Sequence, residues 1–189
     1  MSERPMRADA RRNYERLLTA AGEAFAERGE RASMDEIAKR AGVGAGTLYR
    51  HFPTREALVV AVYEAGLSAA CGQAHALLAR SGPGQALYAW VRVLARHWEE
   101  CGELSRLMAA IFEQDGAAKE SCQRMLFDAA DAVLAEARAA GTVRADLSAV
   151  ELIRLTHTAV LAAAPRRTAE VVPVDRMLEL TLDGVRPRG

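Results

Sequence analysis

Four polar side chains with groups suited to contacting a phosphate backbone lie within five residues of one another. They are Thr47, Tyr49, Arg50 and His51. Hydroxyl, guanidinium and imidazole groups donate hydrogen bonds to phosphate oxygens and to the edges of nucleic acid bases. Apolar Leu48 and Phe52 are interspersed among them, so a short helix over residues 45–52 would bury the apolar residues and expose the polar ones.

Residues 33–52 also contain what is needed to position such a helix. They predict two short helices joined by a tight turn at Gly42, because glycine readily adopts the backbone angles that such turns require. The small Ala38 permits close approach of the second helix, and Val43 would pack between the two. This is the pattern of a helix-turn-helix, which presents its second helix to the major groove of DNA.

Here the sequence resembles the TetR family of bacterial transcriptional regulators. The similarity covers about residues 13–58, through RLLTAAGEAFAERG and then ASMDEIAKRAGVGAGTLYRHFPTREAL. Its most specific part is GTLYRHF followed by PTREAL, which a helical enzyme has no reason to carry. The rest of the chain resembles the family in length, helical character and order of elements.

The resemblance implies that the helix over 45–52 is a recognition helix, which binds the major groove of a double-stranded operator. Thr47, Tyr49 and His51 match positions where the family usually touches phosphate or base, and Arg55 matches a basic phosphate-contacting position. Ser33 and Thr54 begin helices, whose N-termini favour phosphate, and Gly46 would let the backbone approach DNA closely. The full expected contact set is Ser33, Ala45, Gly46, Thr47, Tyr49, Arg50, His51, Thr54 and Arg55.

The chain departs from the family pattern at Gly44 and Ala45, where the family often has a polar or basic residue. The missing base contact could come from Arg50, or from Arg11 and Arg12 in an arm that enters the minor groove. Two alternatives remain open. Tyr49 could be a packing residue, and the arginines over residues 4–12 could be a solvated tail.

The composition predicts an all-α fold, because strong helix formers dominate and no long stretch alternates with period two. Asp9 is the expected N-cap of the first helix, and Gly29 its end. Ser33 with Glu36 predicts a reciprocal capping box. Further helices are expected at about 54–80, 103–113, 117–140, 148–163 and 173–183, with a hairpin turn at 81–84 and another apolar stripe over 87–98.

We expect an N-terminal three-helix helix-turn-helix domain over residues 1–58 and a C-terminal helical domain over 59–189. The resemblance implies that the second domain binds a ligand and dimerises, and two-fold pairing would let the dimer read a palindrome. The expected homodimer interface lies on two helices. The helix over 148–163 presents Leu152, Leu155, Thr156, Ala159, Val160 and Ala163. The helix over 173–183 presents Met177, Leu178, Leu180 and Thr181. The alternative is that these faces close the core of a single chain.

The candidate ligand pocket is a set of aromatic, methionine and aliphatic side chains with one titratable group. They are Trp90, Leu94, His97, Trp98, Met108, Phe112 and Met125. Such a set would suit a small, mostly apolar effector held by few polar anchors. A stripe at this helical spacing is equally consistent with ordinary core packing.

Metal binding and catalysis are both disfavoured. Cys71 with His75 and His97 with Cys101 could form a Cys₂His₂ site, but a hairpin turning near residue 82 would offset the pairs by about 6 Å. We therefore expect neither metal nor cofactor. The alternative function is an all-helical enzyme that uses His97 and nearby carboxylates, although no recognisable nucleophile–base–orienter spacing appears. Those carboxylates are Glu99, Glu100, Glu103, Asp128 and Asp131.

The net charge of zero, from 25 basic and 25 acidic residues, excludes a uniformly basic coat. Residues 1–60 carry 11 basic and 9 acidic groups, so the small positive excess coincides with the predicted helix-turn-helix. The first residues lack the apolar region of a signal peptide, and no run of 18 apolar residues predicts a membrane span. With three widely spaced cysteines and no CxxC, these features indicate a cytoplasmic protein.

Overall fold

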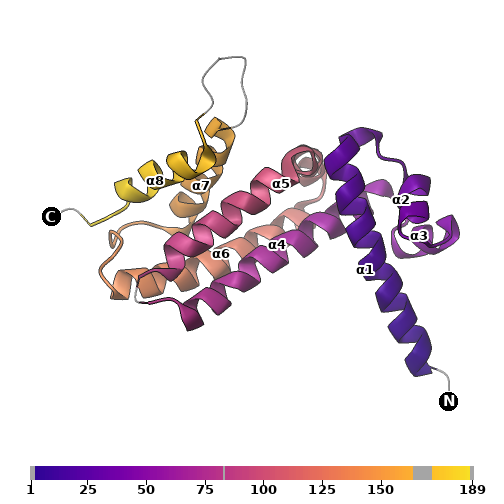
Figure 1. Cartoon of the computed structure of the whole chain (residues 1–189), viewed down its shortest axis with the longest axis horizontal. Coiled ribbons are helices and arrows are strands. Elements are labelled where there is room, and N and C mark those ends of the chain that lie inside the picture. Colours follow the sequence, from indigo (N-terminus) through magenta and orange to yellow (C-terminus); the bar gives the residue numbers. More distant parts are fainter. Residues whose placement is uncertain (1–2, 83, 164–171, 188–189) are drawn as a thin grey trace. The chain divides into compact units, whose positions relative to one another are not determined.

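The computed structural model describes residues 3–82, 84–163 and 172–187, with side chains from residue 9 onward. The regular structure of this part is helical, which confirms the all-α prediction. The elements are α1 (Glu3–Arg28), the 3₁₀ turn η1 (Gly29–Arg31), α2 (Met34–Arg40), α3 (Ala45–His51), α4 (Arg55–Arg80), α5 (Ala86–Gln114), α6 (Gly116–Ala139), α7 (Ala149–Ala163) and α8 (Val174–Gly184), as labelled in Figure 1.

The chain forms two compact units. The first comprises Met1–Ala65 and Cys101–Ala118, and the second comprises Gly66–Glu100 and Lys119–Gly189. Helices α4 and α5 each contribute one part to each unit. Helix α5 is kinked at Gly102, whose φ of 7° and ψ of −90° are not helical. The sequence predicted separate helices on either side of this residue.

In the first unit, α2 packs against both α1 and α3 (Figure 1). These helices share an apolar core. The largest fully buried side chains of this unit come from five helices. They are Leu17 and Phe25 of α1, Ile37 of α2, Leu48 of α3, Leu58 of α4 and Met108 of α5. Because α2 and α3 have only seven residues each, this shared core rather than intrinsic helix propensity holds them in place.

Most of the predicted helix ends are confirmed. The Ser33 hydroxyl accepts a hydrogen bond from the Glu36 N–H at 3.1 Å. The helix expected from about residue 148 is α7, and Ser148 and Glu151 form a complete reciprocal capping box at its start. The expected return bond from the Glu36 carboxylate to Ser33 was wrong, because Glu36 instead accepts from Arg28 at 2.8 Å.

The predicted N-cap at Asp9 was also wrong. Helix α1 begins at Glu3, and the Asp9 carboxylate forms an exposed ion pair with Arg12 one turn further on. The residues before Asp9 are good helix formers around a single proline at position 5, which is tolerated in the first turn of a helix. The basic segment up to Arg12 is therefore helical.

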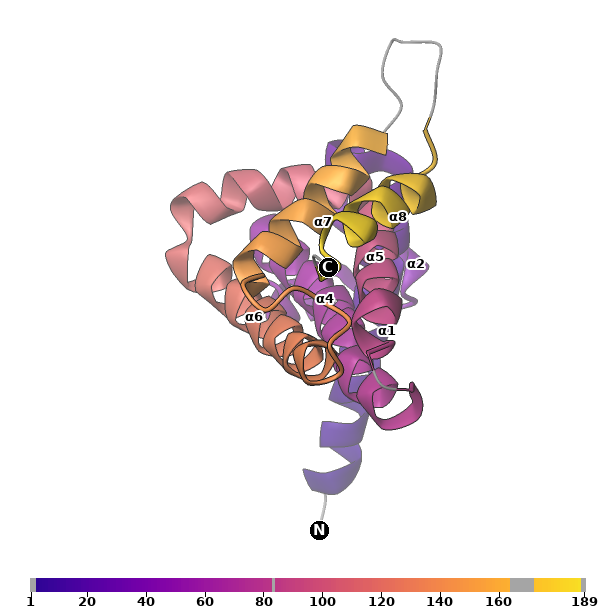
Figure 2. The ribbon, with the colours of Figure 1, turned by 90° about the vertical axis from the view of Figure 1, so that its left-hand side faces the viewer.

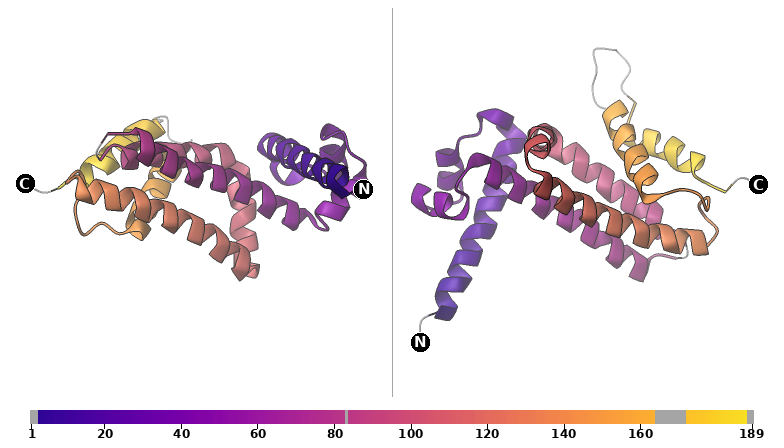
Figure 3. Two further views of the ribbon diagram at one scale, coloured as in Figure 1. Left: turned by 90° about the horizontal axis from the view of Figure 1, so that it is seen from below. Right: turned by 180° about the vertical axis from the view of Figure 1, so that it is seen from behind.

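In the second unit, the adjoining parts of α4, α5 and α6 lie side by side (Figure 3). Trp90 is fully buried, and its indole N–H donates to the carbonyl of Ala70 at 3.1 Å, which ties α5 to α4. Helices α7 and α8 pack against each other (Figure 2). The Tyr88 hydroxyl donates to the carbonyl of Thr142, which fixes the segment between α6 and α7 against α5.

Helix α4 is the one described helix that is long and apolar enough to cross a membrane by composition alone. Its most apolar 18 residues have a mean hydropathy of 1.3, and 39% of them are buried within the protein. Its buried side chains include Leu58, Val59, Tyr63 and Leu67, so one face of the helix belongs to the protein core.

Candidate nucleic-acid interface

The turn between α2 and α3 has the geometry of a Schellman motif. Gly42 adopts a φ of +65°, its N–H donates to the carbonyl of Lys39 at 3.1 Å, and the N–H of Val43 donates to the carbonyl of Ala38 at 3.0 Å. These contacts confirm the predicted tight turn at Gly42. Ala38 is buried and Val43 is half-buried, and the predicted role of the small Ala38 side chain stays a prediction. The turn ends α2 sharply and so sets the direction of α3.

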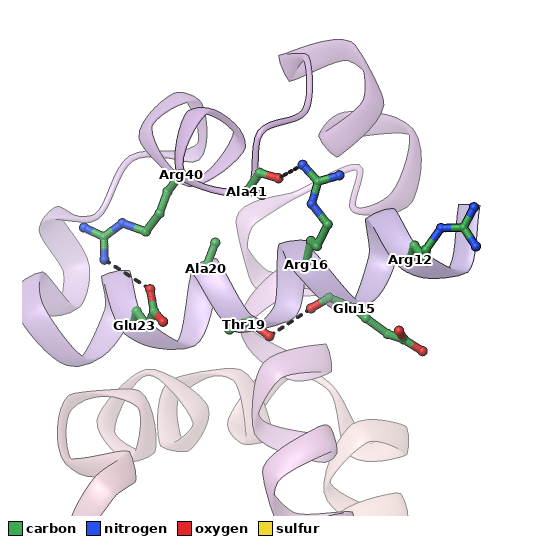
Figure 4. A pocket seen from close by; sticks show the side chains of 8 residues that line it. All are labelled: Arg12, Glu15, Arg16, Thr19, Ala20, Glu23, Arg40 and Ala41. Atoms are coloured by element: carbon green, nitrogen blue, oxygen red, sulfur yellow. Dashed lines mark hydrogen bonds and ion pairs between the residues drawn. The ribbon is translucent and has the colours of Figure 1, made fainter. Parts of the chain in front are cut away.

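Arg16 of α1 holds this turn from the other side. Its guanidinium donates to the carbonyl of Gly42 at 2.9 Å and to that of Ala41. Figure 4 shows the Arg16 side chain reaching across a groove of about 460 Å³ to the end of α2. These carbonyls lie past the last helical residue and lack intrahelical partners, so Arg16 satisfies them.

Ion pairs of Arg40 also connect α2 to α1. Arg40 makes two hydrogen bonds with the Glu27 carboxylate, at 2.9 and 2.8 Å, and lies 3.8 Å from Glu23 (Figure 4). The hydrogen bond from Arg40 lowers the pKa of Glu27. Since these groups are exposed, the network contributes little to stability, and its ion pairs link α2 to α1.

Helix α3 presents one apolar and one polar face, as the sequence predicted. Leu48 is fully buried and Phe52, which follows the helix, is 3% exposed. On the opposite side Tyr49 is 47% exposed and Arg50 is exposed. A tyrosine in the core would be buried, so the alternative of Tyr49 as a packing residue is not supported by its exposure.

Thr47 and His51 are half-buried at the edges of this polar face. The His51 ring lies 6.0 Å from the ring of Tyr14 in an edge-to-face arrangement. Tyr14 belongs to α1 and is 36% exposed, so α1 also contributes an aromatic side chain beside the polar face of α3. Ala45 and Gly46 are exposed at the start of α3, and no atom lies within 4 Å of where a Cβ on Gly46 would be.

The two hydroxyl residues expected at helix starts both cap their helices. Ser33 caps α2, and Thr54 Oγ1 accepts from the N–H of Ala57 at 3.1 Å at the start of α4. Both residues are exposed. Because both caps are exposed, the N-termini of α2 and α4 are accessible to solvent. Backbone N–H groups at such helix ends can bind an anion.

Arg55 lies in a different environment from the one that the sequence suggested. Its half-buried guanidinium donates to the carbonyls of Gly29 at 3.1 Å, of Glu30 at 3.0 Å and of Ala32. It also lies 5.1 Å from the ring centre of Phe25. Arg55 thus joins the start of α4 to the turn between α1 and α2, and its expected phosphate contact stays a prediction.

The candidate pocket residues are mostly packed in the two cores. Trp90, Leu94 and Met108 are at most 1% exposed, and Met108 and Phe112 belong to the first unit whereas the others belong to the second. Of this set, His97 lines a described groove between α4 and α5. His97 lies against Gly66, as expected for a hairpin that turns near residue 82. No metal-binding cluster is found among the described residues.

Sequence reasoning missed the internal roles of Arg16 and Arg55. Each contacts carbonyl groups more than twenty residues away, and no local pattern announces such a contact. It also missed Tyr14, which is not part of the expected contact set and lies beside His51.

Both halves of the chain match described domain families. Residues 17–62 match the family of bacterial regulatory proteins called tetR, and residues 82–187 match the C-terminal domain of SbtR-like transcriptional regulators. An HTH-type transcriptional regulator of Staphylococcus aureus is 44% identical over 63 residues. That alignment covers 33% of this chain and 34% of the relative, so the similarity to this curated protein spans about a third of its length.

Solved structures resemble nearly the whole chain. A TetR transcriptional regulator of Streptomyces coelicolor is 32% identical, with a TM-score of 0.75, over 93% of this chain and 99% of its own. A TetR regulatory protein of Mycobacterium vanbaalenii is 36% identical, with a TM-score of 0.72, over 97% of this chain and 100% of its own.

Proposed function

This chain belongs to the TetR family of bacterial transcriptional regulators, and we propose that it is a ligand-responsive repressor that binds a palindromic operator as a homodimer. Binding DNA through a helix-turn-helix is a property of the family, which is not enzymatic, so the alternative of a helical enzyme is set aside. The observation that carries the proposal is the exposed polar face of α3, held by Gly42 and Arg16.

In the proposed complex α3 enters the major groove. Exposed Arg50 would read a base edge, and Tyr49 with Thr47 would contact phosphates beside it. Ser33 and Thr54 support this arrangement because each caps an accessible helix N-terminus. Exposed Arg11 and Arg12 are helical, so a minor-groove contact from them would come from the N-terminal part of α1.

We assign DNA binding to residues 1–58, and ligand binding and dimerisation to residues 59–189, in the cytoplasm and without a membrane partner. Most side chains expected at the homodimer interface are buried within one chain, among them Leu152, Thr156 and Leu178. Exposed apolar side chains nevertheless remain on both helices. They are Val150, Leu155 and Leu161 on α7, and Leu180 on α8. These residues support dimerisation because exposed apolar surface commonly marks an interface.

Release would follow from a population shift. One state of the dimer has the spacing of recognition helices that fits the operator, and a small effector binds another state more tightly. Helix α4 supports this coupling because its residues belong to both units. The sequence suggested a mostly apolar effector. Because Trp90 and Leu94 are fully buried and not accessible, the effector would bind in the accessible groove at His97.

A gel-shift experiment with the DNA upstream of the chain's own gene tests the proposal. We expect retardation at low salt that weakens steeply as salt is added, because phosphate contacts release counterions. A variant with Tyr49→Ala and Arg50→Ala should lose this retardation, while Arg124→Ala, which removes an exposed arginine of α6, should retain it. Retardation that is absent at low salt, or equal in all three proteins, contradicts the proposal.

A further inference from the structure

A groove of about 460 Å³ runs between α4 and α5 in the second unit. Its α4 wall consists of small residues and one amide, and its α5 wall carries all of the charged side chains. The lining residues are Gly66, Ala69, Ala70 and Gln73, and Arg92, Val93, Arg96, His97 and Glu100. This volume lies within the range of about 300–1,000 Å³ that small-ligand sites occupy.

The small residues on α4 keep the two helices close and the groove open. A Cβ atom on Gly66 would lie 2.8 Å from Cε1 of His97, so a larger residue there would displace the imidazole ring from its place against α4. His97 itself is 9% exposed and forms part of the groove floor. Ala69, which is exposed, and half-buried Val93 add an apolar surface to the groove.

Two arginines of α5 make the groove attractive to an anion. Arg92 and Arg96 are four residues apart and therefore lie on one side of the helix. Both are exposed, and within the described part of the chain no carboxylate lies within 4.0 Å of either. Other arginines of this unit are paired, such as Arg144 with Asp146 and Arg186 with Asp183.

Glu100 limits the charge that a ligand can carry. It lines the same groove one turn beyond Arg96, so it would repel an anion with several negative charges. A single carboxylate would bring only one negative charge near Glu100, and an apolar body attached to it would find apolar surface at Ala69 and Val93. A phosphate would carry more charge toward Glu100 and offer no apolar surface.

We propose that this groove binds a small organic acid, whose carboxylate is held by Arg92 and Arg96 and whose apolar body lies against Ala69 and Val93. As the effector site, the groove rests on the proposed regulatory function. Binding itself does not, because it can be measured in the absence of DNA.

Hexanoate is the probe, with hexanol and inorganic phosphate as comparisons. Titration calorimetry on the full chain should show saturable binding of hexanoate, with hexanol and phosphate about tenfold weaker or more, because each lacks either the charge or the apolar body. Trp90 provides a second readout, since its indole N–H bonds to Ala70, which lines the groove.

Three variants locate the site. Replacing Arg92→Gln and Arg96→Gln together should weaken hexanoate binding about tenfold or more. Ala69→Phe should weaken it by filling the groove without changing the charge. Arg124→Gln is the matched control, because Arg124 is another exposed arginine of the same unit and does not line this groove. Circular dichroism checks that each variant is folded.

The outcomes are decisive in both directions. Loss of binding in the arginine and Ala69 variants, with retention in Arg124→Gln, supports the site. Absent hexanoate binding, equal loss in the control, or phosphate binding as tight as hexanoate overturns it. If hexanoate binds as expected but a gel shift shows unchanged operator affinity, the groove stands as a binding site and its assignment as the effector site fails.

Discussion

A Cβ atom on residue 42 would lie 2.5 Å from Nη2 of Arg16, so the glycine leaves the space that the guanidinium occupies. The same glycine has a φ of +65°, which side-chain-bearing residues rarely adopt. The turn before α3 therefore depends both on its own backbone angles and on a side chain from α1. Replacing Gly42 by a larger residue would strain the backbone and collide with the Arg16 guanidinium.

Gly42→Ala should lower the free energy of unfolding by about 1–2 kcal/mol, because an alanine in the left-handed region is strained. Urea denaturation measures this change. Gly72→Ala is the control: this glycine lies inside α4 with no atom within 4 Å of its Cβ position, so alanine should raise stability by up to about 1 kcal/mol.

A double-mutant cycle separates the two causes. Arg16→Gln removes the guanidinium that meets the new Cβ. The loss of unfolding free energy caused by Arg16→Gln should therefore be smaller in the Gly42→Ala background than in the native chain. Strictly additive effects would mean that backbone strain alone accounts for the loss.

Arg55→Gln should destabilise the protein by about 1–3 kcal/mol, because three carbonyl groups lose a charged donor and Phe25 loses its cation contact. If Arg55 keeps its three carbonyl contacts when DNA binds, the dependence of operator affinity on salt should keep its slope. A slope lower by about one would instead show that Arg55 turns to a phosphate when DNA binds. Denaturation curves and salt titrations of the same variant distinguish these results.

Tyr49→Phe and Arg50→Ala should affect operator binding in different ways. Loss of the Tyr49 hydroxyl should weaken binding by a similar factor across operator sequences, because a phosphate contact carries no sequence information. Loss of Arg50 should cost about 1–3 kcal/mol and relax the preference at one base pair if it reads a guanine. Affinities measured for a set of single-base operator variants test both, and a uniform effect of Arg50→Ala would contradict base reading.

Local signals explain which parts of the fold the sequence predicted. The caps at Ser33 and Thr54 and the turn at Gly42 depend on residues within five positions of one another, as does the division of α3 into two faces. The start of α1 was mispredicted because a cap signal at Asp9 competes with a longer run of helix formers. Here propensity prevailed over a side chain that could cap.

The internal contacts of the candidate site could not be read from the sequence. An arginine near DNA-facing residues has the same local pattern whether it binds a phosphate or three backbone carbonyls, as Arg55 does. In the same way, the apolar stripe of α7 does not say which neighbour covers it. Within the chain Leu152 is buried while Leu155 remains 40% exposed.

The three cysteines should differ in thiol reactivity. Burial raises the pKa of Cys71 from 9.0 to about 11, and Cys122 is also buried whereas Cys101 is half-buried. At pH 8 a thiol reagent should therefore modify Cys101 first in the native protein. The neutral Cys71 thiol is favoured in the folded state, so its contribution to stability is complete below about pH 9 and is lost as the pH rises toward 11. Cys71→Ala should reduce this loss, as denaturation at a series of pH values can show.

Leu155→Glu combined with Leu180→Glu should shift the proposed homodimer toward monomer. Leu155 of α7 is 40% exposed and Leu180 of α8 is 51% exposed, and both line a groove of about 530 Å³ between the two helices. A carboxylate there would be desolvated on association, which costs free energy in the dimer and not in the monomer. Sedimentation measures the molecular mass, and operator affinity should fall in parallel because a monomer reads one half-site. Ala110→Glu in α5 is the matched control at an exposed position. A double variant that stays dimeric would place the interface on another surface of the chain.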